Sequence, residues 1–307
     1  MSQVNLVGIL VPIRSEAGLY QYAQRALSLQ NMTTLLIIDP QNDFHEGGSL
    51  AVPGSTRDSF MTAAFIEKNS SSIDSIVVTL DTHSKLHIAH GSFWQSQHDS
   101  KLRPPPFTNI RVDDIESGKW IPRDPSLIHY CKKYITSLEA SGKFMHTIWP
   151  DHCLLGSTGH AVTGIIQSAI NEWSDKHASK SKEVKFVLKG QNCLTEMYSA
   201  LAAEVPVEDD ISTHMNNELR DDLLPSPGGK GKTKQLIVCG QAKSHCVNFT
   251  LRDILGPAPP IEVANNVFLL EDCTSAVTGF EESADKFILD MKKFGVNCTT
   301  SEAFKFS

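Results

Sequence analysis

Short apolar runs recur along the chain, and each is followed by turn residues and then by a longer stretch with helical spacing. The first run, 34–38, ends at Asp39-Pro40 and is apolar after its threonine, as expected for a strand that is buried on both faces. Five more runs predict strands at 75–80, 144–148, 184–188, 235–239 and 267–270. This alternation is typical of repeated βαβ units.

Helical spacing fills most of the connections between these strands. The predicted helices cover 57–68, 125–141, 159–177, 195–204, 245–255 and 281–294. The pattern predicts an α/β fold with a doubly wound, mostly parallel six-stranded sheet and helices on both faces. Ligands bind such sheets outside the carboxyl ends of the strands, where the strand order reverses. We therefore look for chemistry in the residues that directly follow each strand.

Three segments do not follow this repeat. They are 1–33, the proline-bearing stretch 94–123, and 206–234, which is acidic at first and then rich in proline, glycine and lysine. None has an apolar periodicity that would support a core of its own. We predict a single domain over 34–307, with an N-terminal extension at 1–33 and surface insertions near 94–123 and 206–234.

Composition narrows the classes of function. The chain has 307 residues, 40% of them apolar, and its 28 Lys+Arg against 35 Asp+Glu leave a net charge of -7. With no basic run to bind phosphates, nucleic acid is not an expected partner. The apolar runs are far shorter than the roughly 20 residues of a membrane span, so no membrane association is expected. Seven scattered cysteines and the lack of a secretory signal predict a cytoplasmic protein.

Three chemically complementary residues follow or adjoin the ends of predicted strands. Asp39 follows the first strand, Lys189 follows 184–188, and Cys246 lies near the start of the helix after 235–239. A thiol needs a base, a nearby cation or a helix N-terminus to react as the thiolate. Each residue by itself has an ordinary explanation as a turn residue, a solvated lysine or a buried thiol. Their meeting at one sheet edge favours a cysteine nucleophile with an acid–base partner.

A second group of residues suits a divalent metal ion. Asp81-x-His83 follows the second strand, and His152 follows the run 144–148. One carboxylate and two imidazoles fit a borderline ion with positions left open for water or substrate. Asp-x-His by itself is a weak signal, and His87 and His90 lie close enough to be further ligands or ordinary loop residues.

Five motifs, in order from Thr34 to about Ala276, resemble those of the isochorismatase-like cysteine hydrolases, particularly in their nicotinamidase form. They are Asp39-Pro40-Gln41-Asn42-Asp43-Phe44 with Gly47-Gly48-Ser49-Leu50; Asp81-Thr82-His83; Trp149-Pro150-Asp151-His152-Cys153; Lys189-Gly190 with Glu196 and Tyr198-Ser199-Ala200; and Gly240-Gln241-Ala242-Lys243-Ser244-His245-Cys246-Val247.

The resemblance implies a role for each matching residue. Cys246 corresponds to the nucleophile, Asp39 to the proton-transferring carboxylate and Lys189 to the third catalytic residue. The remaining correspondences are the metal ligands Asp81, His83 and His152, the oxyanion-hole N–H groups of Ala242 and Cys246, the substrate-binding residues Phe44, Trp149, Gln241 and Tyr198, and a cis peptide between Gln241 and Ala242.

The sequence departs from the family pattern near the metal motif. Thr82 stands where an aromatic residue is usual, and Ser84 stands where a proline is usual. The His-x-Ser-Phe element begins at His90, three residues late, while His87 has the more usual spacing. The further metal ligand is therefore open between His87 and His90.

The resemblance implies an amidohydrolase that converts nicotinamide to nicotinate and ammonia through a cysteine thioester, as a step of NAD salvage. A divalent metal would orient the pyridine ring, with zinc as the first choice and iron or manganese as alternatives. One alternative is a related cysteine hydrolase that acts on another small amide or an N-carbamoyl compound. Another is a non-catalytic binding subunit of the same fold. The expected partner is a small-molecule amide, and a homo-oligomer is left open.

Overall fold

The computed structural model describes residues 3–6, 9–12, 32–142, 144–180, 182–226 and 232–306. A six-stranded sheet lies at its centre, in the order β12-β11-β10-β3-β4-β9, and every pairing in it is parallel. Its strands are β3 (Met32–Ile38), β4 (Ser75–Asp81), β9 (Lys185–Lys189), β10 (Thr233–Gly240), β11 (Val267–Leu270) and β12 (Asn297–Thr299). From β3 the chain moves outward to β4 and β9, then returns to β10 on the other side of β3. The strand order therefore reverses between β3 and β10, and the predicted fold class is confirmed.

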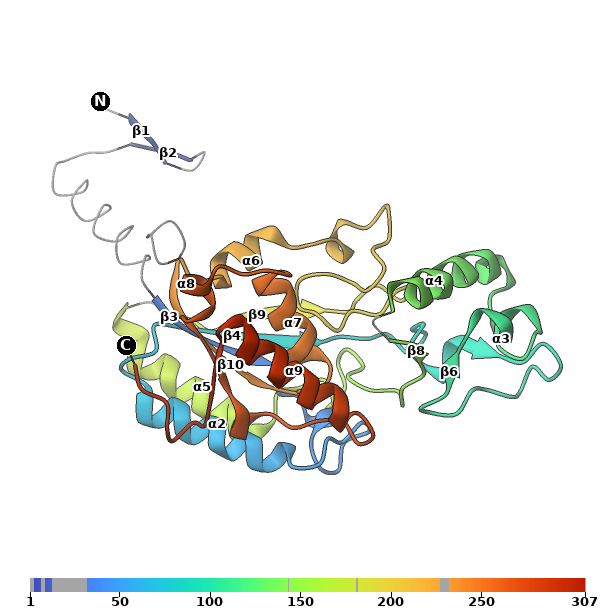
Figure 1. The fold of residues 1–307 in the computed structure, drawn as a ribbon, viewed down its shortest axis with the longest axis horizontal. Helices are drawn as coiled ribbons and strands as arrows, with labels where there is room; N and C mark the ends of the chain where they lie inside the picture. Colours follow the sequence, from blue (N-terminus) through green and yellow to red (C-terminus); the bar gives the residue numbers. More distant parts are fainter. Residues whose placement is uncertain are drawn as a thin grey trace.

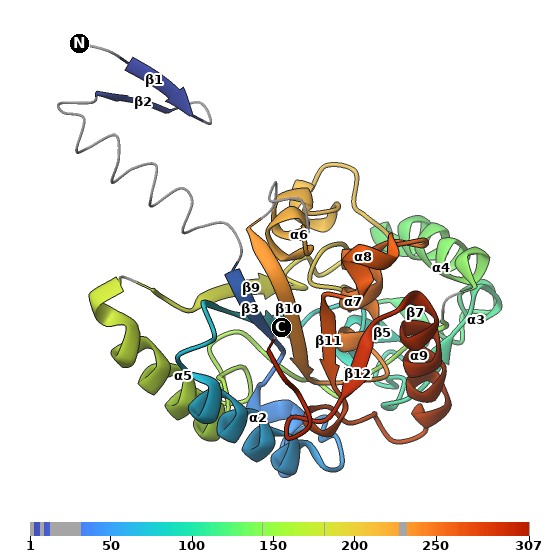
Figure 2. The same cartoon turned by 60° about the vertical axis from the view of Figure 1, so that its left-hand side comes forward.

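Helices cover both faces of this sheet (Figures 1 and 2). The side chains of β3 alternate between two apolar clusters: Leu36 and Ile38 pack on one face, and Leu35 and Ile37 on the other. The second face is covered by α2 (Ser55–Asn69) and α5 (Gly164–His177). The first is covered by α6 (Asn217–Leu223), α7 (Cys246–Leu255), α8 (Ile261–Ala264) and α9 (Glu281–Phe294).

A third apolar cluster lies at one end of the molecule, where α3 and α4 lie together (Figure 1). Its elements are α3 (Val112–Glu116), α4 (Ile128–Ser141), the pair β5 (Trp94–Gln95) and β7 (Ile121–Pro122), and the pair β6 (Asn109–Ile110) and β8 (His146–Thr147). The stretch 94–123 therefore contributes to a packed core that it shares with α4. Trp94 and Trp120 are buried there with Tyr134 of α4, and the short elements of 94–123 show no periodic pattern that would reveal this.

Two predicted elements are wrong. In the run 144–148 only β8 is a strand, and it pairs with β6 outside the main sheet, because Ile148 packs into the third cluster. The sixth strand of the sheet is β12. Residues 195–204 form turns rather than a helix, because other groups bind their backbone N–H groups. The Ala200 N–H, for example, donates to the Thr250 hydroxyl (3.0 Å).

The remaining helix predictions agree with the structure to within a few residues, and 281–294 agrees at both ends with α9. In the extension 1–33, β1 (Gln3–Leu6) and β2 (Ile9–Pro12) pair antiparallel, and most of the other residues lie outside the described part. So does 227–231 within the insertion 206–234. Short 3-10 helices occupy Asn42–Phe44, Gly91–Phe93, Pro125–Leu127, Ala178–Lys180, Ile211–Thr213 and Glu271–Cys273. Within the described ranges, no helix has the length and apolar character needed to cross a membrane.

Candidate active site

The residues that the sequence placed after separate strands lie together at the carboxyl edge of the sheet. Asp39 follows β3, Asp81 and Lys189 end β4 and β9, and Cys246 begins α7 after β10. The strand register produces this meeting directly, because Asp81 and Lys189 are cross-strand partners and Gly240 pairs with Ile38. Four adjacent strands, on both sides of the point where the order reverses, thus supply one site.

Lys189 is the centre of this cluster. Its Nζ lies 3.0 Å from Asp39 Oδ2, 3.0 Å from Asp81 Oδ1 and 3.6 Å from Cys246 Sγ. The ammonium also donates to the Met197 carbonyl at 3.0 Å. Lys189 is only 2% exposed and Asp39 is completely buried. The structure thus brings the three predicted catalytic residues into mutual contact.

Thr79, on the neighbouring strand β4, fixes the Asp39 carboxyl group. The Thr79 hydroxyl donates to Asp39 Oδ1 at 2.6 Å and lies 3.1 Å from the Asp39 N–H. Asp39 has a φ of 45°, a region that residues with a side chain rarely adopt. The paired contacts with Thr79 hold the carboxyl of this unusual turn toward Lys189 and Cys246.

Burial sets the protonation of the cluster. Burial raises the pKa of the Cys246 thiol well above its ordinary value, although the Lys189 charge opposes this shift. Burial also raises the pKa of Asp39, again against the effect of Lys189. For Lys189 itself, burial is outweighed by the two carboxylates, and its pKa is raised well above normal. Lys189 thus lowers the pKa of the thiol, but burial has the larger effect, and burial also makes the neighbouring Asp39 carboxyl more basic.

Two backbone N–H groups beside the thiol are unused. Neither Ala242 N nor Cys246 N donates a hydrogen bond within the described ranges, although the Ala242 carbonyl accepts from His245 N (3.0 Å) and Val247 N (3.2 Å). Both residues line the same small cavity, and the peptide between Gln241 and Ala242 is cis. Free N–H groups next to a nucleophile can stabilise an oxyanion.

The cavity over Cys246 has mainly apolar and aromatic walls. They include three of the predicted substrate-binding residues, Phe44, Trp149 and Tyr198. The cavity is small and leaves about 30 Å³ for the centre of a water-sized sphere, enough for about two waters.

Gln241, the fourth predicted substrate-binding residue, points away from this cavity. Its amide donates to Asp58 Oδ2 at 2.8 Å, and its carbonyl oxygen lies 3.4 Å from Ser275 N. The Gln241 amide thus holds the nucleophile loop, and its side chain is not among the walls of this cavity. The walls instead include four residues without a predicted pocket role, Leu50, Glu196, His245 and Val277. Leu50, Glu196 and His245 lie inside the family motifs, and this position in the sequence could have identified them as pocket residues.

The proposed metal ligands form a compact group next to this cluster. Asp81 Oδ2 lies 3.0 Å from His83 Nε2 and 3.2 Å from His152 Nε2. These distances are those of ion pairs, and they bring the carboxylate and the two imidazoles to one place. The Nδ1 atoms of the two histidines face the carbonyls of Gly190 (3.3 Å) and Pro150 (2.8 Å). A carbonyl can only accept, so each Nδ1 carries a proton. Against the effect of burial, the Asp81 carboxylate raises the pKa of His83.

The geometry distinguishes the two candidates for a further ligand. His87 uses both ring nitrogens: Nε2 donates to the Asn192 carbonyl (3.1 Å), and Nδ1 accepts from Ala89 N (3.2 Å). His90 Nδ1 is buried without a hydrogen-bond partner in the described chain. Nitrogen atoms of His83, His90 and His152 all lie within 4.8 Å of one another. Burial lowers the pKa of His90 to about 2, which keeps the ring in the neutral form that binds metals.

A second, overlapping group contains His83, His87 and the buried carboxylate of Glu196, also within 4.8 Å of one another. Because His87 is hydrogen-bonded at both nitrogens, this group needs a side-chain rearrangement to bind an ion. The geometry therefore favours His90 over His87.

Gln41 holds the end of β4 in place. Its side-chain amide is completely buried, donates to the Asp81 carbonyl at 2.7 Å and accepts from Asp81 N at 2.7 Å. It therefore binds the Asp81 backbone as a neighbouring strand would. Asp43 similarly ties two loops together, because its Oδ2 accepts from Cys153 N at 2.7 Å.

Comparisons with known proteins agree with this geometry. The nicotinamidase of Escherichia coli K12 is 27% identical over 222 residues, which cover 72% of this chain and 75% of that protein. The structure of the yeast nicotinamidase bound to nicotinaldehyde matches with a TM-score of 0.55 and 21% identity, over 88% of this chain and 100% of that one. A Pyrococcus horikoshii pyrazinamidase in complex with zinc matches with a TM-score of 0.50 and 18% identity, over 88% and 99%. No protein-family model matches the sequence.

The fold, the site and these similarities together indicate the class: the chain resembles the isochorismatase-like hydrolases. Within this class it is a nicotinamidase-like protein, a hydrolase that acts on amides.

Proposed function

We propose that this chain hydrolyses nicotinamide to nicotinate and ammonia through a thioester on Cys246. The observation that carries the proposal is the contact of Lys189 with both Asp39 and Cys246, beside two unused backbone N–H groups in one cavity. The similarity to the Escherichia coli nicotinamidase supports the choice of substrate.

Because burial raises the pKa of the Cys246 thiol, the thiol needs a base, and Asp39 is placed to act as one. Asp39 takes the thiol proton while Sγ of Cys246 attacks the carboxamide carbon, and the N–H groups of Ala242 and Cys246 receive the developing oxyanion. Asp39 then gives the proton to the leaving nitrogen, and ammonia departs as the thioester forms. Water, deprotonated by Asp39, opens the thioester, which releases nicotinate and restores the thiol. Lys189 stays charged throughout and stabilises both the carboxylate and the thiolate.

Asp81, His83, His90 and His152 would hold a divalent ion, with zinc as the first choice and iron or manganese as alternatives. When bound, the ion supplies a Lewis-acidic position for the pyridine nitrogen. The donor set of three imidazoles and one carboxylate suits such an ion, and zinc is named with the Pyrococcus horikoshii structure.

Ammonia release from three amides tests the substrate. We expect metal-replete enzyme to act on nicotinamide and pyrazinamide, and to discriminate against benzamide, which lacks the ring nitrogen, by up to about 10⁴-fold in kcat/KM. Equal kcat/KM for nicotinamide and benzamide would show that the metal does not take part in recognising the substrate. No activity on all three would instead favour a related hydrolase of N-carbamoyl compounds or other amides, and failure on a wider amide panel would favour a non-catalytic binding subunit.

We infer further that residues 34–307 act as one domain, in the cytoplasm and without nucleic-acid or membrane partners, and that the product enters NAD salvage. Gel filtration of the full chain distinguishes a monomer from a homo-oligomer. Limited proteolysis tests the domain, since a single domain predicts that cleavage is confined at first to 1–33 and the insertion 206–234, whereas 94–123 is packed into the third cluster.

A further inference from the structure

His245, the residue before the nucleophile, carries a hydrogen-bonding group that the proposed catalytic steps leave unused. His245 is only 8% exposed, and it lines the catalytic cavity together with Trp149 and Tyr198. Its ring contacts those of Trp149, Tyr198 and Phe280, at centroid distances of 5.2, 5.1 and 4.7 Å. These aromatic contacts fix the imidazole beside the space that a substrate enters.

Ser244 determines which nitrogen of this imidazole carries the proton. The Ser244 oxygen accepts from Val277 N at 3.1 Å and lies 2.9 Å from His245 Nδ1. Among the described residues, Nδ1 is the one acceptor within reach of the Ser244 hydroxyl proton, so Nδ1 accepts. Burial lowers the pKa of His245 to about 4, which keeps the ring neutral at pH 7. The single ring proton is therefore on Nε2.

The Nε2–H group of His245 is an unpaired donor. It has no hydrogen-bond partner in the part of the chain that the structure describes, and protein atoms do not cover it completely. The neighbouring indole N–H is different, because Trp149 Nε1 already donates to the Tyr198 hydroxyl at 3.0 Å. The cavity thus has mainly apolar and aromatic walls with one imidazole N–H that is free to bind a ligand.

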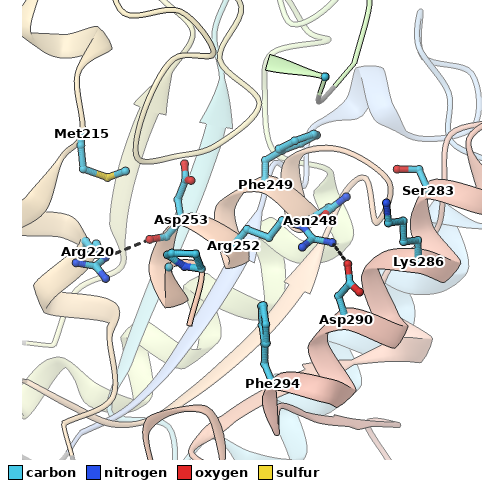
Figure 3. Close-up of a pocket in the computed structure, with 13 residues that line it drawn as sticks. Met215, Arg220, Asn248, Phe249, Arg252, Asp253, Ser283, Lys286, Asp290 and Phe294 are labelled. Atoms are coloured by element: carbon cyan, nitrogen blue, oxygen red, sulfur yellow. Dashed lines mark hydrogen bonds and ion pairs between the residues drawn. The ribbon is translucent and has the colours of Figure 1, made fainter. Parts of the chain in front are cut away.

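The groove in Figure 3 is a separate surface. It has a volume of about 670 Å³ and lies between α7 and α9, where Arg252 pairs with Asp290 at 2.8 Å. Phe249 lines this groove and stacks on Tyr198, which lines the catalytic cavity, with ring centroids 5.6 Å apart. His245 is not among the described residues that line the groove. A ligand that accepts from His245 must therefore enter the catalytic cavity.

Nicotinamide has no acceptor left for this donor if the proposed function holds, and the inference rests on that function. The carboxamide oxygen accepts from the N–H groups of Ala242 and Cys246, the carboxamide nitrogen offers only hydrogens, and the ring nitrogen lone pair is directed to the ion. We propose that His245 is a specificity-determining residue whose Nε2–H selects aromatic amides with one more acceptor, a second ring nitrogen. A ring that covers the donor without accepting from it loses a hydrogen bond that water makes in the free cavity, so it binds less tightly.

The test is calorimetric titration of the zinc-loaded Cys246→Ala protein, which lacks the proposed nucleophile. The ligands are nicotinamide and pyridazine-3-, pyrazine-2-, pyrimidine-5- and pyridazine-4-carboxamide. These diazines keep a nitrogen meta to the carboxamide and place the second nitrogen at each remaining ring position in turn. Adding His245→Phe should weaken one diazine about tenfold and nicotinamide less than about twofold, because one neutral hydrogen bond is lost.

His177→Phe, added to Cys246→Ala, is the matched control. His177 is a buried histidine on α5 whose Nδ1 lies 2.8 Å from the Trp173 carbonyl, away from the cavity. This control variant should leave all five affinities unchanged. A second measurement is long-range ¹H–¹⁵N NMR of the free protein, which we expect to show the His245 proton on Nε2.

Three results would overturn the inference. The first is that no diazine loses more affinity than nicotinamide on His245→Phe, and the second is a His245 proton on Nδ1; both leave amide hydrolysis unaffected. The third is no binding of any of the five amides up to about 10 mM. In that case ammonia release from nicotinamide by the wild-type enzyme would show that the proposed function survives, and its absence would overturn both.

Discussion

Lys189→Met should strongly destabilise the folded protein as well as stop catalysis. The substitution nearly preserves side-chain volume but removes the positive charge that lies 3.0 Å from both Asp39 and Asp81. At an effective dielectric constant of about 20, each contact at this distance is worth about 5 kcal/mol before relaxation. Loss of one member of a buried ion pair usually costs about 3–5 kcal/mol after relaxation and proton uptake. We expect the free energy of unfolding to fall by about that amount.

The same strand provides a matched control. Lys185 is an end residue of β9 like Lys189, but its side chain is 49% exposed and its Nζ lies 3.5 Å from Asp222. Solvent screens such a pair, so Lys185→Met should change the free energy of unfolding by no more than about 0.5 kcal/mol. Urea unfolding of wild type and both variants, followed by far-UV circular dichroism at pH 7, measures the difference. A loss below about 1 kcal/mol for Lys189→Met would refute the reasoning.

The pH dependence of this variant has a defined sign. Lys189 lowers the pKa of Asp39, so its removal raises that pKa further above the unfolded value. A group whose pKa is higher in the folded state contributes stability below its unfolded pKa and loses it as pH rises through the folded pKa. The deficit of Lys189→Met relative to wild type should therefore shrink as the pH is lowered from 7 toward 5. Adding Asp39→Asn should recover part of the stability at pH 7, because one buried charge is then absent.

Three further predictions concern the nucleophile, the metal and one loop. Cys246→Ala should abolish ammonia release with the fold intact, whereas Cys193→Ala, outside the cavity, should retain activity; equal losses would point to structural roles. His90→Ala should lower the metal content measured by atomic absorption, and His87→Ala should not, unless the ligand assignment is wrong. The hydrogen bond from Thr56 is the main reason that the pKa of Glu46 is lowered from an ordinary 4.5 to about 2. The ionised Glu46 carboxylate therefore stabilises the folded protein above pH 4.5, and this stabilisation is lost as the pH falls toward 2. Glu46→Gln should accordingly lower the Tm at pH 7 but hardly at pH 2.5, and an equal Tm deficit at both pH values would contradict this.

The catalytic cluster could be predicted from sequence because it depends on a simple geometric rule. Apolar runs located β3, β4, β9 and β10, and parallel strands bring the residues at their carboxyl ends to one edge. Asp39, Lys189 and Cys246 meet for that reason. The helix α9 was equally predictable, since its apolar spacing and the following Gly295 both mark local structure.

Features that depend on contacts between distant segments could not be predicted. The short strand β12 has no apolar run and exists because β11 offers it an edge, while the apolar run 144–148 leaves the sheet for the third cluster. The direction of the Gln241 side chain was likewise set by Asp58, 183 residues away.

The chemical state of the site was also decided only by tertiary structure. The sequence placed a thiol near a lysine and a helix start, which both favour the thiolate, but only the fold shows that the thiol is buried, and burial raises its pKa despite the Lys189 charge. The sequence left His87 and His90 equivalent as candidate metal ligands. Only the folded structure shows that both His87 nitrogens are hydrogen-bonded, to the Asn192 carbonyl and the Ala89 N–H. Sequence patterns report which elements form and where their ends meet, whereas protonation and ligand choice depend on solvent exclusion and on hydrogen-bond partners, which exist only once the chain has folded.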